Sequence, residues 1–86
     1  MKLSNVINEL KSPKEVEIFL KDLCTPSEIK ALNERWEVAQ LLYQKNKSYR
    51  KIASELGTST ATVTRVARFL FSESNYGYQN AFKRIT

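Results

Sequence analysis

The sequence predicts an all-α fold of about six helices, and three observations support this prediction. Apolar residues recur at the three- and four-residue spacing of amphipathic helices, and no segment alternates as a β-strand would. The 86 residues contain only two glycines and two prolines. Both prolines directly follow a Ser or Thr, as at the start of a helix. At this length we expect a single domain, with parts at 1–45, 48–71 and 76–86.

Three helices are expected in the first part. The short first helix is indicated by Leu3, Val6, Ile7 and Leu10, which keep helical spacing. The segment Ser12-Pro13-Lys14-Glu15 predicts the start of a second helix, with Ser12 as N-cap and Glu15 completing a capping box. The segment Thr25-Pro26-Ser27-Glu28 repeats this signal, so a third helix is expected from there to about Lys45.

The third helix is apolar on more than one side, especially after Trp36. A helix of this kind must be buried on several sides, and so short a chain cannot supply all of the covering surface. We therefore expect a homodimer in which a second subunit provides part of the core. The residues expected in that core are Val16, Phe19, Leu20, Leu32, Trp36 and Leu42.

The segment SYRKIASELGTSTATVTRVARFL fits a helix-turn-helix. Ser48 caps a helix that runs to Leu56, Gly57 suits the left-handed turn, and a second helix follows from about Ser59 to Phe71. Small Ala53 permits the two helices to cross closely, and Val63 and Val66 give the second helix its apolar face. A last amphipathic helix is indicated by the spacing of Tyr78, Phe82 and Ile85.

Charge is distributed unevenly along the chain, whose formal net charge is +5. Up to Tyr43 there are six basic and seven acidic residues, whereas from Lys45 onward there are eight basic and two acidic residues. A basic half of this kind is typical of a surface that binds a polyanion.

Five of the seven residues from Thr58 to Thr64 carry a hydroxyl, although Ser and Thr are mediocre helix formers. In a major groove, hydroxyls can bond base edges, and small side chains can touch the thymine methyl group. The second helix of the pair is therefore predicted to read double-stranded DNA. The predicted DNA-binding residues are Lys45, Lys47, Arg50, Lys51, Ser59, Thr60, Ala61, Thr64, Arg65 and Arg68, with Lys45 and Lys47 assigned to phosphates.

Other classes of protein are disfavoured. The chain has no histidine and a single cysteine, Cys24, which we expect to be a small buried hydrophobe. The sequence has no pattern typical of a metal site, a Cys–His nucleophile or a phosphate-binding glycine loop. We therefore expect that the protein is not an enzyme and binds no metal or cofactor. No signal peptide or membrane span is recognised, which predicts a cytoplasmic protein that does not bind membranes.

The segment from Ser12 to Phe82 resembles the Trp repressor superfamily and, within it, the Trp-repressor-like YerC/YecD family. The matching residues are Thr25-Pro26, Glu28, Ala31-Leu32, Arg35, Leu41-Leu42, Glu55-Leu56-Gly57 and Ala61-Thr62-Val63-Thr64-Arg65. The resemblance implies an intertwined all-α homodimer that presents a helix-turn-helix to successive major grooves and acts as a repressor. It also implies that Arg50, Thr60, Ala61 and Thr64 face DNA.

The resemblance further implies an effector pocket. Arg35, Thr62 and Arg65 fall where Trp repressor holds tryptophan. However, Val66 and Phe69 replace a glycine and a serine there, and both add bulk. We therefore expect that tryptophan does not bind, and that the pocket is either filled by the protein's own side chains or takes another small molecule, whose identity is unknown.

An alternative interpretation remains at this point. The helix-turn-helix scaffold can serve as a protein-interaction module that does not read DNA, because a fold does not dictate a function. The basic half of the chain favours DNA, since a protein-docking module has no need for its excess positive charge.

Overall fold

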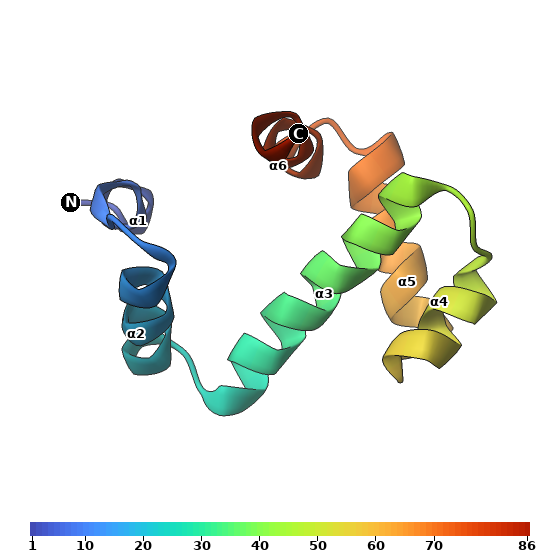
Figure 1. Ribbon diagram of the computed structural model, residues 1–86, viewed down its shortest axis with the longest axis horizontal. Coiled ribbons are helices and arrows are strands. Elements are labelled where there is room, and N and C mark those ends of the chain that lie inside the picture. The colour runs from blue at the N-terminus through green and yellow to red at the C-terminus, as the bar shows by residue number, and fades with distance from the viewer. The chain divides into compact units, whose positions relative to one another are not determined.

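The computed structural model describes all 86 residues, Met1–Thr86, and consists of helices joined by short turns (Figure 1). Its elements are α1 (Leu3–Glu9), α2 (Pro13–Leu23), α3 (Pro26–Gln44), α4 (Tyr49–Leu56), α5 (Thr60–Ala67), the π-helical turn η1 (Arg68–Ser72) and α6 (Gly77–Ile85). The prediction of an all-α fold is confirmed. None of these helices has both the length and the apolar content needed to cross a membrane.

The chain divides into two compact units, Met1–Ala31 and Leu32–Thr86. In the first unit, capping residues define where the helices begin. The Ser12 hydroxyl accepts a hydrogen bond from the Glu15 amide at 3.2 Å. At the start of α3, Thr25 and Glu28 form a reciprocal capping box, with amide-to-side-chain distances of 2.8 and 3.2 Å. These local bonds satisfy amides that the first helical turn leaves without partners.

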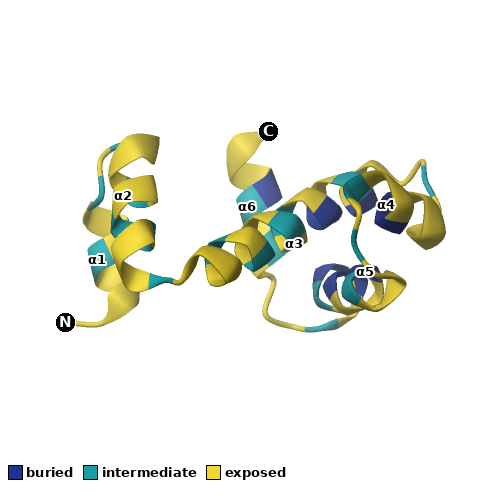
Figure 2. Ribbon diagram, turned by 90° about the horizontal axis from the view of Figure 1, so that it is seen from below, coloured by how far each residue is buried: buried dark blue, intermediate teal, exposed yellow.

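The first unit has no buried residue in the isolated chain. Both α1 and α2 carry apolar side chains, yet Leu3, Ile18 and Leu23 each remain about half exposed. Figure 2 shows the same contrast, because the buried class is absent from α1 and α2. An amphipathic helix is stable in water when its apolar face is covered, so these helices leave apolar surface to be covered by something else.

The second unit contains the hydrophobic core. Val38, Ala39 and Leu42 of α3 are buried together with Ile52 and Ala53 of α4, and with residues of α5, η1 and α6 (Figures 1 and 2). The unit therefore begins within α3, at Leu32, whereas the sequence analysis separated the parts after residue 45. The reason is that the C-terminal half of α3 packs its apolar face against the helix-turn-helix.

Aromatic stacking attaches α6 to α3. The ring of Phe82 stacks on Tyr43, with centroids 4.1 Å apart, and on Trp36, with centroids 4.9 Å apart. Tyr78 stacks more loosely on Trp36 at 6.3 Å. Of the predicted apolar stripe, Phe82 is buried and Tyr78 is half-buried, but Ile85 remains exposed.

The helix expected from Ser59 to Phe71 is α-helical only up to Ala67. Beyond that, η1 widens the helix by one residue, and the Glu73 amide donates to the Arg68 carbonyl at 2.9 Å. A π-helical turn is rare and occurs mostly as a single widened turn in a longer helix, so the spacing of apolar residues did not indicate it.

Candidate nucleic-acid interface

The turn between α4 and α5 has the geometry of a helix-turn-helix. Gly57 adopts a left-handed conformation, with φ +64°, and ends α4. The amides of Gly57 and Thr58 donate back to the Ser54 and Ala53 carbonyls, at 3.4 and 3.0 Å. These bonds form the motif that closes many helices at a glycine. The Thr58 hydroxyl also donates to a carboxylate oxygen of Glu34, which ties the turn to α3.

The helix α5 has one buried face and one exposed face. Val63, Val66 and Ala67 are buried in the core, whereas Thr60 and Thr64 are exposed. Ala61 and Arg65 are exposed as well, and so are Ser59 and Arg68 at the two ends of the helix. The face assigned to DNA in the sequence analysis is therefore open to solvent in this chain, and its small side chains permit close approach to a base pair.

Ser59 has a structural task at the beginning of α5. Its hydroxyl accepts a hydrogen bond from the Thr62 amide at 3.1 Å and lies 3.1 Å from the Thr62 hydroxyl. The Ser59 hydroxyl thus caps the helix, and the Thr62 hydroxyl is taken up by a contact with it. Those of Thr60 and Thr64 have no partner within the chain and remain available to an external one.

The basic residues around α4 differ in how they are held. Lys47 lies 2.7 Å from a carboxylate oxygen of Glu55, and Lys51 lies 4.0 Å from the other oxygen. The hydrogen bond from Lys47 holds the pKa of Glu55 below its usual value, so that carboxylate is ionised at neutral pH. Lys45 lies 5.9 Å from the ring centroid of Phe71, whereas Arg50 is exposed and has no ion-pair partner.

Two arginines follow on α5 and η1. The guanidinium groups of Arg65 and Arg68 lie 4.9 and 5.4 Å from the ring centroid of Phe69. Arg68 also donates from Nε to Glu73 at 3.0 Å. Contact with the ring orients Arg65 towards a neighbouring cavity, so the structure gives this residue surroundings different from those of the hydroxyl face.

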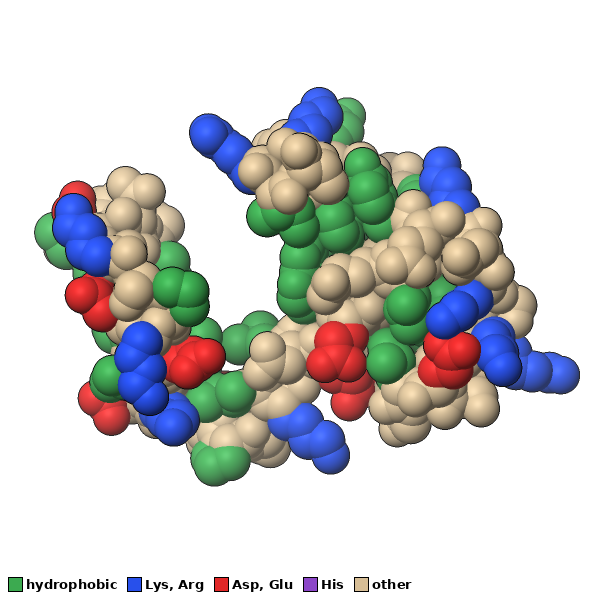
Figure 3. All heavy atoms as spheres, viewed as in Figure 1, with side chains coloured by type: hydrophobic (Ala, Val, Ile, Leu, Met, Phe, Trp, Pro, Cys, Tyr) green, Lys and Arg blue, Asp and Glu red, His purple; other side chains and the backbone are tan.

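That cavity, of about 470 Å³, lies between α3, α5, η1 and α6. Its lining consists of Arg35, Trp36, Arg65, Val66, Phe69, Asn75, Gly77, Tyr78 and Ala81. A volume of this size is within the range of about 300–1,000 Å³ common for small-molecule sites. Hydrophobic side chains gather between α6 and α3 on the surface seen in Figure 3.

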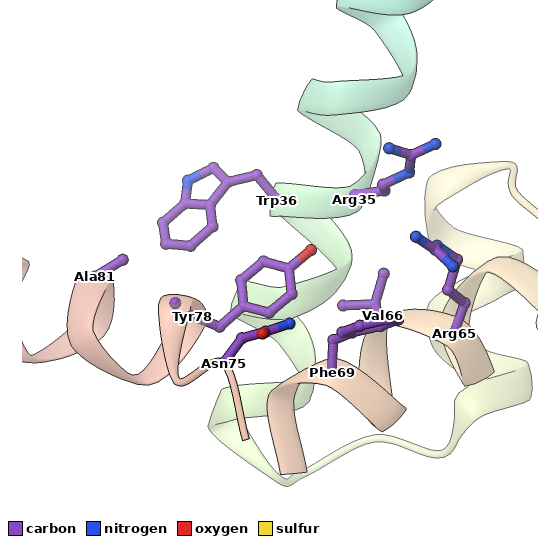
Figure 4. A pocket seen from close by; sticks show the side chains of 9 residues that line it. Arg35, Trp36, Arg65, Val66, Phe69, Asn75, Tyr78 and Ala81 are labelled. Carbon is purple, nitrogen blue, oxygen red and sulfur yellow. The ribbon is translucent and has the colours of Figure 1, made fainter. Parts of the chain in front are cut away.

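The positively charged side chains of the cavity lie on one side of it. Arg35 and Arg65 lie close to one another in Figure 4, whereas Trp36 and Ala81 lie on the opposite side. No acidic residue lines the cavity. Val66 and Phe69 occupy part of its wall, as their bulk led us to expect, but an open volume remains beside them. Thr62, which the resemblance placed here, does not line the cavity, because its amide and hydroxyl are at the cap of α5.

Five lining residues were not assigned to this pocket from sequence: Trp36, Asn75, Gly77, Tyr78 and Ala81. Trp36 was expected in a dimer core, and Tyr78 on the apolar side of the last helix. Because the cavity forms only when α6 folds back onto α3, local spacing does not reveal it. The adjacency of Trp36 to Arg35 was the one signal that could have indicated its place.

The residues expected at a dimer core differ in exposure. Val16, Phe19, Leu20 and Trp36 are half-buried in the isolated chain, and Leu32 is 46% exposed. Leu42, however, is buried at 4% exposure within the second unit. Leu42 is therefore covered by its own chain, and the other five keep exposed surface.

Comparison with known proteins identifies the family. The sequence model of the Trp repressor protein family matches residues 1–86. The chain belongs to the Trp repressor family. Within this family, it is 45% identical over 86 residues to the uncharacterised protein YerC of Bacillus subtilis (strain 168), covering 96% of this chain and 78% of that protein.

A solved structure has the same fold. The crystal structure of a TrpR-like protein from Eubacterium eligens ATCC 27750 superposes with a TM-score of 0.86. The two sequences are 41% identical, and the match covers 96% of this chain and 84% of that one. The resemblance stated from the sequence is thereby confirmed.

Proposed function

We propose that this chain is a sequence-specific DNA-binding regulator of transcription, acting as a repressor in the cytoplasm. The observation that carries this proposal is the exposed face of α5, where Thr60, Ala61 and Thr64 lie opposite the buried Val63 and Val66. A helix held by its apolar face, with small hydroxyl-bearing residues outside, suits insertion into a major groove. Membership of the Trp repressor family supports the same function.

The proposed active form is a homodimer. The first unit leaves its apolar residues uncovered, and a second copy of the same unit offers a matching surface. A two-fold dimer presents two copies of α5 to half-sites about one helical turn, or ~34 Å, apart. The apolar sides of α1 and α2 are thus assigned to the subunit interface, and the α5 faces to DNA.

Selection of bound sequences from a random pool of duplex DNA tests this function. Purified protein should enrich a palindromic consensus, which would report both sequence reading and two-fold symmetry. If the selection enriches no sequence and the protein binds no duplex at low salt, these results would favour a protein-interaction module instead.

We also propose that the cavity beside α5 takes a small anionic effector other than tryptophan. The two guanidinium groups of Arg35 and Arg65 favour an anion, and the rings of Trp36, Phe69 and Tyr78 favour an apolar or aromatic body. Val66 and Phe69 reduce the space in which an indole would otherwise lie.

Isothermal titration calorimetry with tryptophan at millimolar concentration tests the exclusion. We expect no saturable heat with this protein. A clear micromolar isotherm would show that the bulk of Val66 and Phe69 does not keep tryptophan out.

A further inference from the structure

The single acidic residue of α4 contacts two of the lysines predicted to bind DNA. Glu55 uses one carboxylate oxygen for Lys47, at 2.7 Å, and the other for Lys51, at 4.0 Å. About a third of the Lys47 and Glu55 side-chain surface is still exposed. Basic side chains lie beside an acidic one at α4 in the space-filling view (Figure 3). The carboxylate thus sits where an external anion would otherwise meet these lysines.

The second acidic residue of the basic half makes a similar contact. Glu73, directly after η1, accepts a hydrogen bond from Nε of Arg68 at 3.0 Å. Apart from Glu55, no other acidic residue follows residue 45. Both carboxylates of this half are therefore bound to cations of the proposed DNA interface, and neither is placed away from it.

A carboxylate and a phosphate compete for the same donors. Both are anionic oxygen acceptors that favour Lys and Arg, so a cation shared with Glu55 or Glu73 must leave or loosen that contact to bind DNA fully. Exposed ion pairs are weak, which keeps this exchange reversible. Arg68 keeps its terminal nitrogens free of Glu73, whereas Glu55 faces two lysines at once. The effect of Glu55 should therefore be the larger.

We propose that Glu55 and Glu73 are affinity-setting residues of the DNA interface, which occupy phosphate-binding cations in the free protein and yield them to the duplex. This inference rests on the proposed DNA-binding function. Because phosphate contacts supply essentially all of the non-specific affinity, the two carboxylates weaken binding to DNA of any sequence. They thereby limit the time that the protein spends on sites that it does not recognise.

Fluorescence anisotropy with a random-sequence duplex, at fixed low salt, tests the proposal. Glu55→Gln should bind about two- to five-fold more tightly than the original chain, the range that an exposed ion pair is worth. Glu73→Gln should bind more tightly by a smaller factor. Glu37→Gln is the matched control, because Glu37 is an exposed residue of α3 without an ion-pair partner, and it removes the same charge.

A double-mutant cycle separates the local contact from the overall gain of positive charge. In an Arg68→Gln background, the additional change Glu73→Gln should tighten binding no more than Glu37→Gln does. In a background lacking both lysines, Lys47→Gln and Lys51→Gln, the gain from Glu55→Gln should shrink to the same level. Circular dichroism of each variant confirms that the helices are retained.

The outcomes are distinguishable. Tighter binding by both glutamine variants, beyond that of Glu37→Gln and dependent on the partner cations, supports the proposal. If the original chain binds duplex DNA and the two variants bind no more tightly than the control, the carboxylates do not set affinity, while the DNA-binding function stands. If no protein in the set binds duplex DNA, the proposed function and this inference are both overturned.

Discussion

The Thr25 and Glu28 side chains exchange two hydrogen bonds at the start of α3. The bond from the Thr25 amide is the main reason that the pKa of Glu28 lies below its ordinary value, and the bond involving the Thr25 side chain adds to it. A carboxyl with a lowered pKa stabilises the fold above its unfolded pKa of about 4.3 and loses that contribution as the pH falls. Its capping is therefore fully effective at neutral pH and lost in acid.

The lowered pKa of Glu28 predicts how stability depends on pH. Glu28→Gln keeps an acceptor oxygen for the Thr25 amide but removes the titration. Between pH 7 and pH 3, the stability of the original chain should fall further than that of the variant. Thermal denaturation followed by circular dichroism at both pH values measures the difference. Equal losses in the two proteins would show that this cap does not depend on the charge.

Thr64 is a sharp test of the reading face, because its side chain is exposed on α5 and contributes nothing to the core. Thr64→Asp places a negative charge where the duplex would approach, so specific DNA affinity should fall by at least about tenfold. Thr64→Ser keeps the hydroxyl and serves as the matched control. Anisotropy with a selected operator measures the affinities, and unchanged binding by Thr64→Asp would move the reading face elsewhere.

At the residue scale, the sequence predicted the contacts that form between residues close together in the chain. The caps by Ser12 and Ser48 are present as expected, because each depends on a donor only three residues away. Contacts between distant segments were not predicted. The bond from Thr58 to Glu34 joins residues 24 apart, and no local pattern indicates it.

The sharp end of α4 depends on the left-handed backbone of Gly57, with φ +64°. A Cβ at this position would meet no heavy atom within 4 Å, so a substitution is opposed by the backbone conformation alone. Gly57→Val should cost about 1–2 kcal/mol of unfolding free energy. Gly57→Asn should cost less, since asparagine tolerates this region better. Chemical denaturation compares the two, and equal stabilities would contradict the backbone argument.

At the scale of elements, the residues at which helices begin were easier to predict than those at which they end. The capping signals predicted before α2, α3 and α4 all mark true helix starts. The end of the expected 59–71 helix was different, because the α-helix ends at Ala67 and η1 continues it to Ser72. The cavity beside η1 was also not predicted as a whole, because it forms only where α3 and α6 pack together.

At the scale of the whole molecule, the homodimer remains a prediction from the sequence and from the uncovered apolar residues of the first unit. Leu32 provides a clean test, because it is 46% exposed in the isolated chain. Leu32→Glu should cost a solitary chain little, but it would place a charge in the interface that we expect. The original chain should sediment as a species of about twice its 9.9 kDa, and the variant as a smaller one.

Gln40→Glu is the control for that experiment, since it adds the same charge at an exposed position of α3. It should sediment as the original chain does. Sedimentation of the original chain as a monomer at micromolar concentration would contradict the dimer. The apolar sides of α1 and α2 would then need another cover.

The π-helical turn after α5 has a consequence for how sequences of this kind can change. A turn of η1 contains one residue more than an α-helical turn, so the end of the helix at Ser72 lies about 100° around the axis from where a regular helix would carry it. Removing a single codon between Arg68 and Ser72 would let the helix end in a regular turn and change the direction in which residues 73–76 leave it. The segment before α6 would then start from a different side of the helix, so we expect such a deletion to weaken the stacking of Phe82 on Trp36 and Tyr43.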